Sequence, residues 1–286
     1  MLLSATGMSL IGVFGKFGIQ DLTVSALMFW RYAATSSCLF LSLLLLGRLK
    51  GFLNFRHIKI QLLRAFFVLL AQYCFFYYLL HNNLLNAAAL LNTGPVFIAV
   101  IEWGILRKKV GVSTWIGSSI SFLGALLILQ PDAGIFSFIS LIGLLSGISQ
   151  GASQVVFGLQ SEREEKPHIG VMQLFSLCTI LSLLPFLYFH TEMQIGKSWS
   201  HWDFLLIAGL AVTSIFNQIS RAEAYAHGTP SRLSPYLYFA VLLAGVWDWA
   251  IFGMAPNWLS IVGATLVVLG GLLKIYLRNK ILKKKA

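Results

Sequence analysis

The sequence predicts an all-α polytopic membrane protein of ten transmembrane helices, arranged as two inverted five-helix repeats. Three observations lead to this fold class: an apolar composition, ten separate apolar blocks, and a short motif that occurs once in each half. Of the 286 residues, 57% are hydrophobic and 11% are charged, and the mean hydropathy is +0.79. Soluble domains carry roughly 25% charged residues, so this composition excludes an ordinary globular protein.

The apolar blocks are long enough to cross a bilayer as helices. A helix rises about 1.5 Å per residue, so about 20 residues span a hydrocarbon core of about 30 Å. The first block is longer than the apolar core of a signal peptide, so we expect it to remain as a helix. The loops are short and leave no room for a soluble domain. The expected helices cover approximately residues 2–19, 24–47, 60–80, 84–105, 110–130, 136–160, 168–190, 202–226, 231–253 and 256–277.

A motif near the end of each half indicates an internal repeat. The segment GSSISFLGALLIL begins at Gly117, and a similar segment, GATLVVLGGLLKI, begins at Gly263. Each has two glycines seven residues apart and a following Leu-Leu pair. We therefore divide the chain into a first repeat, 1–131, a second repeat, 132–278, and a basic tail, 279–286. Because five is odd, the second repeat enters the membrane from the opposite side, and inverted repeats around a midplane site are typical of alternating access.

The distribution of Lys and Arg predicts the orientation. If the N-terminus is cytoplasmic, nearly all of the 21 Lys and Arg residues fall in cytoplasmic loops and in the tail, and Lys197 alone lies in an outer loop. The positive-inside rule then places both termini in the cytoplasm, and we expect the bacterial inner membrane. This distribution also accounts for the net charge of +11, so no nucleic-acid partner is expected. We expect the basic tail to contact anionic lipid headgroups.

Charged residues within or near the apolar blocks are candidates for function, because a charge in the membrane usually faces protein or water and has a partner. Arg31 is expected to bind a carboxylate or phosphate of a solute, or to be held by Asp248, which lies at a similar depth. A purely structural ion pair is the alternative. If protons drive transport, Asp248 is the first candidate for the coupling carboxylate and Glu223 is the second. The full set is Lys16, Arg31, Glu102, Arg221, Glu223 and Asp248.

Uncharged polar residues recur at helical spacing in both halves. Gln150 and Gln154 share one face of their expected helix, and Asn92 comes just before a proline that leaves backbone carbonyls without amide donors. Interhelical hydrogen bonding explains each residue alone. Their recurrence in both halves favours a shared polar cavity. The predicted cavity residues are Lys16, Arg31, Tyr73, Tyr77, Asn92, Gln150, Gln154, Asn217, Arg221, Tyr236, Trp247 and Asp248.

Motifs of catalysis and metal binding give little support to another function. Gly147, Ser149 and Gly151 spell G-x-S-x-G, but that motif works on a strand-to-helix turn, whereas these residues lie inside an apolar helix. With Gly143 they fit better as a stripe of small residues for close helix packing. The three cysteines lack metal-ligand spacing, and the sequence has neither a Walker A motif nor an H-E-x-x-H pair. We expect no catalytic residues, no metal and no cofactor.

Several segments together resemble the drug/metabolite transporter superfamily in its EamA-type branch. They are GVFGKFG around Lys16, FWRY at 29–32, AALLNTGPVFIAV at 88–100, WIGSSISFLGALLIL, and the long stretch 224–273. The resemblance implies a ten-helix transporter with cytoplasmic termini and a cavity lined mainly by helices 1–4 and 6–9. Members of that family move amino acids, nucleotide-linked metabolites, S-adenosylmethionine and other small polar solutes.

The chain departs from the family pattern in two turns. Where members commonly carry a glutamate in an FGE-P turn, this chain has FGMAP with Met254, and the corresponding turn in the first half reads LRKKV. Any role of those glutamates is therefore not carried over.

We expect an exporter, exchanger or facilitator of small polar organic metabolites, such as amino acids or related zwitterionic or anionic solutes. A carrier of nucleotide-type or S-adenosylmethionine-like metabolites is the alternative within the class. A membrane-embedded enzyme or a non-transporting scaffold is the alternative of another class. The oligomeric state stays open, with a homodimer among the expectations.

Overall fold

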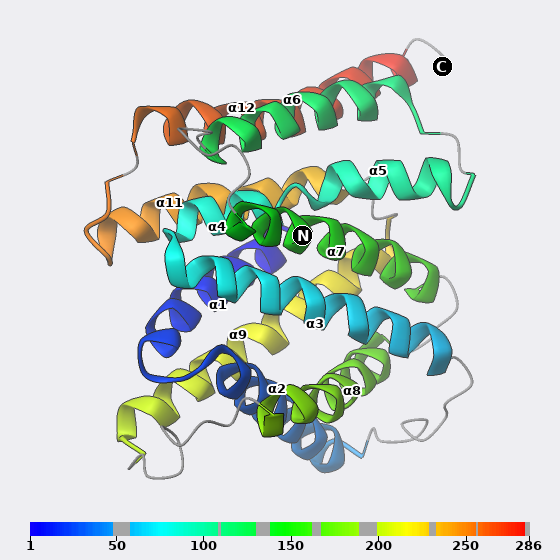
Figure 1. The fold of residues 1–286 in the computed structure, drawn as a ribbon. Helices are drawn as coiled ribbons and strands as arrows, with labels where there is room; N and C mark the ends of the chain where they lie inside the picture. The colour runs from blue at the N-terminus through cyan, green and yellow to red at the C-terminus, as the bar shows by residue number, and fades with distance from the viewer. Residues whose placement is uncertain are drawn as a thin grey trace.

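The computed structural model describes residues 1–47, 58–107, 110–129, 138–161, 167–188, 199–228, 233–255 and 257–283, and every regular element within them is a helix. Figure 1 shows the helices stacked in layers, from α6 and α12 at one edge to α2, α8 and α9 at the other. The elements are α1 (Leu2–Asp21), α2 (Val24–Leu45), α3 (Ile58–His81), α4 (Leu84–Leu91), α5 (Gly94–Gly104), α6 (Val112–Leu129), α7 (Phe138–Ser161), α8 (Pro167–Tyr188), α9 (His201–Ala226), η2 (Ser234–Tyr238), α11 (Phe239–Ala250) and α12 (Trp258–Lys283).

Seven of these helical segments are long and apolar enough to cross a membrane. They are α1, α2, α3, the α4–α5 pair, α7, α8 and α9, and shorter apolar helices follow at Tyr236–Ala250 and Trp258–Leu273. The protein is therefore an integral membrane protein, and its helices fall on the predicted apolar blocks. The count of ten membrane-crossing helices remains a prediction.

The predicted orientation depends largely on loop cations that lie outside the described residues. These loops are 48–57, 108–109, 162–166, 189–198 and 229–232, and residues 284–286 of the predicted basic tail lie outside the described residues as well. The cytoplasmic location of the termini and the contact of the tail with lipid headgroups therefore remain predictions.

The fourth predicted helix is broken in its middle. α4 ends at Leu91 and α5 begins at Gly94, just before Pro95, as the missing amide proton of a proline predicts. The side-chain amide of Asn92 donates to the carbonyl of Ala88 at 2.7 Å, and the Thr93 hydroxyl donates to that of Leu90 at 2.7 Å. These two side chains help to satisfy backbone carbonyls beside the break, where lipid would offer no donor.

The glycine stripe of α7 packs directly against this break. The backbone nitrogen of Gly151 lies 3.3 Å from the point where a Cβ on Gly94 would stand. A Cβ on Gly147 would collide with the Leu90 carbonyl and the Thr93 hydroxyl. The stripe therefore acts as a close-packing surface between helices, as its spacing predicts.

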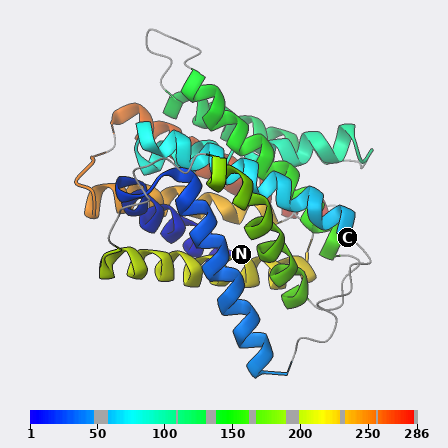
Figure 2. The same cartoon turned by 60° about the horizontal axis from the view of Figure 1, so that its bottom comes forward.

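The two halves pair with each other in a pattern that a two-fold axis would generate. α1 packs on α9, α2 on α8, α3 on α7, α4 on α11, and α6 on α12. In chain order, α1, α2, α3, α4 and α6 of the first half correspond to α7, α8, α9, α11 and α12 of the second. When each helix is exchanged for its counterpart, the α1–α9 pair becomes the α3–α7 pair, and the other three pairs stay the same. The α2–α8 pair, which the exchange maps onto itself, runs side by side in Figure 2. This pairing is the signature of a two-repeat architecture.

The α6–α12 pair shows the same two-fold relation at the level of single atoms. A Cβ on Gly124 would lie 2.5 Å from the carbonyl oxygen of Gly263, and a Cβ on Gly270 would lie 2.5 Å from that of Gly117. These are the four glycines of the repeated motif. The two copies of the motif therefore pack against each other, and the glycines allow the two backbones to approach this closely.

We predict that Gly270→Ala destabilises the protein by about 1–3 kcal/mol, because the new methyl group meets helix backbone that cannot rotate away. The matched control is Gly104→Ala, at a helical position where a Cβ would meet nothing within 4 Å. The measurement is the melting temperature of the purified protein in detergent. Equal melting temperatures for the two variants would contradict the close contact.

Candidate functional site

A small cavity lies between helices of the two halves, at the centre of the polar side chains. Its wall comes from α1, α2, α3 and α4 of the first half and from α7, α8 and α9 of the second. About 40 Å³ is available to the centres of water-sized molecules, and a single water needs about 10–15 Å³ on this measure. The cavity therefore has room for a few waters. Its polar lining is Arg31, Tyr32, Arg64, Gln72, Gln150, Ser153, Gln154, Asn217, Gln218 and Arg221, and its aromatic lining includes Phe75, Phe157 and Phe175.

Arg31 enters this cavity from α2 and is held by neutral groups. Its Nε donates to the Ser214 hydroxyl at 2.9 Å, and its Nη1 donates to Oε1 of Gln72 at 2.8 Å. The guanidinium lies 5.2 Å from the ring centroid of Tyr32. Arg31 is 4% exposed and has no carboxylate partner within the described part of the chain. Its orientation is fixed while its charge is left without a counter-ion.

Arg221 reaches the cavity from α9, and its hydrogen-bond partners in the described part of the chain are also neutral. Its Nε donates to the Ser4 hydroxyl at 3.2 Å, and its Nη2 lies 3.6 Å from the Met8 sulfur, a weak acceptor. One turn earlier on α9, the Asn217 amide donates to the Ser4 carbonyl at 2.6 Å. Asn217 thus joins α9 to α1 beside the arginine.

Arg64 of α3 is a third arginine in the lining, and the sequence reasoning missed it. The distribution of Lys and Arg predicts a position at a cytoplasmic loop for it, but Arg64 is 1% exposed and donates to Gln160 at 2.9 Å and to Gln218 at 3.4 Å. Its guanidinium lies 3.4 Å from the ring centroid of Phe157. The spacing of Arg64 and Gln72, eight residues apart, places both on one helix face and is the signal that identifies Arg64 as a lining residue.

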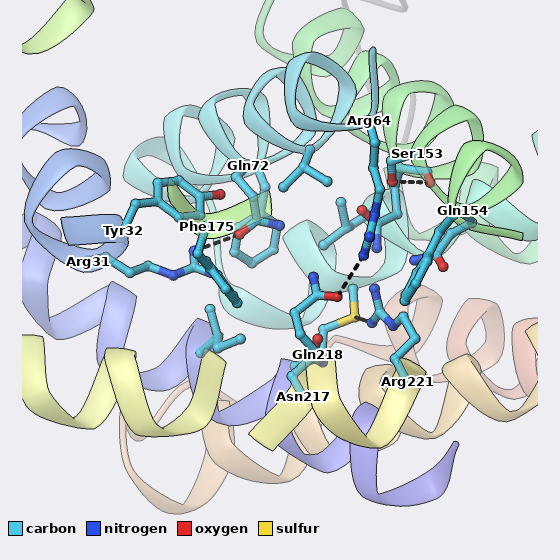
Figure 3. Close-up of a pocket in the computed structure, with 17 residues that line it drawn as sticks. Arg31, Tyr32, Arg64, Gln72, Ser153, Gln154, Phe175, Asn217, Gln218 and Arg221 are labelled. Carbon is cyan, nitrogen blue, oxygen red and sulfur yellow. Dashed lines mark hydrogen bonds between the residues drawn. The ribbon is translucent and has the colours of Figure 1, made fainter. Parts of the chain in front are cut away.

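Figure 3 shows how these side chains converge. Arg31, Arg64 and Arg221 approach the pocket from different sides, and Gln218 lies between them. Beside Arg221, the Tyr225 hydroxyl is hydrogen-bonded to Oε1 of Gln154, which ties α9 to α7. The arrangement is a cationic, polar and partly aromatic chamber whose walls belong to both halves.

The structure brings some of the predicted cavity residues together and separates others. Arg31, Gln150, Gln154, Asn217 and Arg221 line the cavity. Asn92 lines a separate and smaller void beside α1 and α11. Tyr77 and Tyr236 are exposed on the outer surface of the helices, and Tyr73 and Trp247 pack against the apolar core. Depth in the membrane was predictable for these residues, but the side of the helix that each one faces was not.

The expected partnership of Arg31 with Asp248 is wrong. Asp248 of α11 accepts from Lys16 of α1 at 2.8 Å, and its second oxygen accepts from the backbone amide of Leu85, at the start of α4, at 2.6 Å. α11 packs on α1 and α4, whereas α2 packs on α8 and α9. Similar depth did not bring the two residues together, because their helices lie on different sides of the bundle.

The Lys16–Asp248 ion pair is buried and lies outside the lining of the cavity. The side chains of Lys16 and Asp248 are 9% and 3% exposed, so Lys16 does not extend to the lipid headgroups. The Lys16 ammonium also lies 4.2 Å from the ring centroid of Phe252. Glu223, by contrast, is exposed beside His227 at 3.4 Å, on the outer face of α9. The pair joins α1, α4 and α11, and Glu223 faces away from the site.

Comparison with known proteins agrees with this architecture. The model of the EamA-like transporter family matches residues 1–130 and 137–276, which correspond to the two halves and confirm the family resemblance. At the level of the fold, a protein of known crystal structure superposes with a TM-score of 0.69 over 98% of both chains, at 13% sequence identity.

Three curated relatives are transporters by name. A riboflavin transporter from Vibrio cholerae is 30% identical over 63% of this chain, and the match spans 59% of that protein's length, which is less than two thirds. A pseudopaline exporter from Pseudomonas aeruginosa is 24% identical over 68% of this chain and 67% of the exporter's own length. An S-adenosylmethionine uptake transporter from Rickettsia prowazekii is 21% identical over 67% of this chain and 63% of the transporter's own length.

We predict that Lys16→Met lowers the stability of the protein by about 3–5 kcal/mol, because it leaves the Asp248 carboxylate buried without its cation. The double variant Lys16→Met/Asp248→Asn is expected to recover most of this loss, since the asparagine oxygen still accepts from Leu85. Melting temperatures in detergent test both statements. His227→Gln, which removes one member of an exposed pair, is the control and should melt like the wild type. A Lys16→Met protein as stable as the wild type would contradict this account.

Proposed function

This chain belongs to the EamA-like transporter family, and from that premise we propose that it is a secondary transporter of small polar organic metabolites in the bacterial inner membrane. The observation that carries the proposal is the polar cavity enclosed between α1–α4 of the first half and α7–α9 of the second. A site at the interface of two inverted repeats is what alternating access requires. The names of the relatives, which cover riboflavin, pseudopaline and S-adenosylmethionine, support a small-molecule cargo.

The size of the cavity supports a closed state between two open ones. Sites for small organic molecules measure about 300–1,000 Å³, whereas this cavity offers about 40 Å³ to the centres of water-sized molecules. The cavity must widen before a metabolite enters. Because the lining comes from helices of both halves, a rocking motion of one half against the other would widen the cavity on one side and close it on the other.

We propose that Arg31 binds a carboxylate or phosphate of the solute. Its guanidinium is already oriented by Ser214 and Gln72, so little conformational entropy is lost when an anion binds. Amino acids and related anionic solutes are the class first expected, and nucleotide-type or S-adenosylmethionine-like metabolites are the alternative. Export, exchange and facilitated diffusion are all compatible with this site.

We predict that Arg31→Lys lowers solute flux into proteoliposomes by at least about tenfold, because a lysine lacks the planar fork and cannot hold Ser214, Gln72 and an anion together. Arg107→Lys, at an exposed position, is the matched control and should transport like the wild type. The amounts of inserted protein are compared by quantitative blotting. Wild-type flux from the Arg31→Lys protein would exclude Arg31 from solute binding.

We further propose that Asp248 is the coupling carboxylate if a proton gradient drives transport. Asp248 is buried at the junction of α1, α4 and α11, where its carboxylate accepts from Lys16 and from the Leu85 amide. Protonation would remove that ion pair, so the packing of the two halves at this junction would depend on the protonation state. Glu223 is the second candidate, and its exposure favours an ordinary solvated role.

Asp248→Asn is expected to abolish accumulation driven by a pH gradient, because asparagine does not titrate. Since it also leaves Lys16 buried without its anion, the double variant Lys16→Met/Asp248→Asn, which lacks both charges, is measured beside it and is expected to keep solute exchange. The measurement compares uptake into proteoliposomes with and without a pH gradient, and Glu223→Gln serves as the second carboxylate variant. If the wild type moves solute equally with and without a pH gradient or membrane potential, the protein is a uniporter. Asp248 is then only the structural counter-ion of Lys16.

A further inference from the structure

Two arginines of the cavity lining, Arg31 and Arg221, have no carboxylate within hydrogen-bond or ion-pair distance among the described residues. Arg31, Arg64 and Arg221 are each at most 4% exposed, and the described lining contains no Asp or Glu. Among the described residues, the hydrogen-bond acceptors of Arg31 and Arg221 are all neutral: Ser214, Gln72, Ser4 and Met8. A buried cation without a counter-ion carries a large desolvation cost, so an anion that enters the cavity is stabilised by both arginines.

The two arginines mark opposite ends of the cavity. The Arg31 guanidinium lies beside Ser214 of α9, and Arg221 lies seven residues further along the same helix, a rise of about 10 Å. Figure 3 shows Arg31 and Arg221 on opposite sides of the pocket, with Gln218 between them. One compact anion does not reach both guanidinium groups, whereas an elongated molecule with an anionic group at each end does.

A further hydrogen-bond donor, the Tyr32 hydroxyl, lies beside Arg31. The Tyr32 hydroxyl is buried and has no hydrogen-bond partner, and Tyr32 is 1% exposed. In Figure 3 its hydroxyl points towards the pocket, next to Gln72. Buried hydroxyls are rarely left unpaired in proteins, and an anion bound at Arg31 would accept a hydrogen bond from this one.

We infer that the solute of this site is an elongated dianion, with one carboxylate or phosphate at Arg31 and Tyr32 and the other at Arg221, and without an ammonium group. The inference rests on the proposed transport function and names the substrate class of that same cavity. The ammonium group is excluded because the described lining offers no carboxylate to receive it, and next to Arg31 and Arg221 it is repelled. This separates the proposed class from amino acids and from cationic metabolites.

The first test is a binding series with the wild-type protein in detergent, measured by isothermal titration calorimetry. The probes are the aliphatic diacids from succinate to suberate, and each is paired with its own monoamide, which has nearly the same shape and one charge fewer. At the best chain length the diacid is expected to bind at least about tenfold more tightly than its monoamide, because the amide gives up charge-assisted hydrogen bonds. Equal affinities, or no binding of any diacid at millimolar concentration, would overturn the inference.

Two further pairs of probes define the chemistry. Glutamate is glutarate with an added ammonium group, and it is expected to bind at least about tenfold more weakly than glutarate because that group has no acceptor. Tighter binding of glutamate would overturn the inference. 4-Phosphonobutyrate replaces one carboxylate of glutarate with a phosphonate. If the protein binds 4-phosphonobutyrate more tightly than glutarate, the second anionic group of the solute is a phosphate. If it binds glutarate more tightly, that group is a carboxylate, and either result supports a dianion.

Variants assign the two ends of the molecule. In Arg31→Gln and in Arg221→Gln, one carboxylate site remains, so the ratio of diacid to monoamide affinity is expected to fall to about one. Tyr32→Phe keeps the fold, because its hydroxyl bonds to no protein group, and it should weaken the diacid by about threefold to tenfold. If each single variant keeps the wild-type ratio, the two arginines do not bind the two anions.

Flux into proteoliposomes separates failure of this inference from failure of the proposed function. The same diacids are compared with a panel of amino acids and riboflavin. If the panel crosses and the diacids do not, the transporter stands and the dianion is wrong. If neither group crosses faster than in liposomes without protein, both proposals fail.

Discussion

The hydrocarbon interior of a membrane offers no partner to a polar group, so each polar group that the chain carries into it must find one inside the protein. This protein meets the constraint in two different ways. The Asp248 carboxylate accepts hydrogen bonds from Lys16 and from a backbone amide, and the result is a neutral junction of three helices. In the described residues, Arg31 and Arg221 donate to neutral acceptors, so their charge stays available to an anion. The first arrangement stabilises the bundle, and the second attracts an anion from water.

Close packing of backbones organises the rest of the bundle around this constraint. The reciprocal glycine contacts of Gly124 with Gly263 and of Gly270 with Gly117 fasten the two halves at one edge. The cavity lies away from that edge, where α1, α2 and α3 face α7, α8 and α9. Close backbone packing occurs beside the cavity as well, where the Cβ position of Gly7 lies 3.1 Å from the backbone nitrogen of Asn217.

The broken helix connects these features in space. In the first turn of α4, the backbone amide of Leu85 donates to Asp248, and α4 ends at Leu91, at the break before Gly94. At the break, the side chain of Gln150, a cavity residue, lies 3.5 Å from the Cβ position of Gly94. An unbroken set of contacts thus runs from the ion pair through a helix of eight residues to the wall of the cavity.

The sequence by itself determined the membrane class, the positions of the helices, the two related halves and the family, because apolar block length and glycine spacing are local properties of the chain. It also identified Arg31, Gln154, Asn217 and Arg221 as buried polar residues, since their type alone makes them costly in lipid. Only the tertiary structure decided that Asp248 pairs with Lys16 and that Arg64 lines the cavity. Depth follows from counting residues along one helix, but partnership depends on which faces of two distant helices meet, and that is set by the packing of the whole bundle.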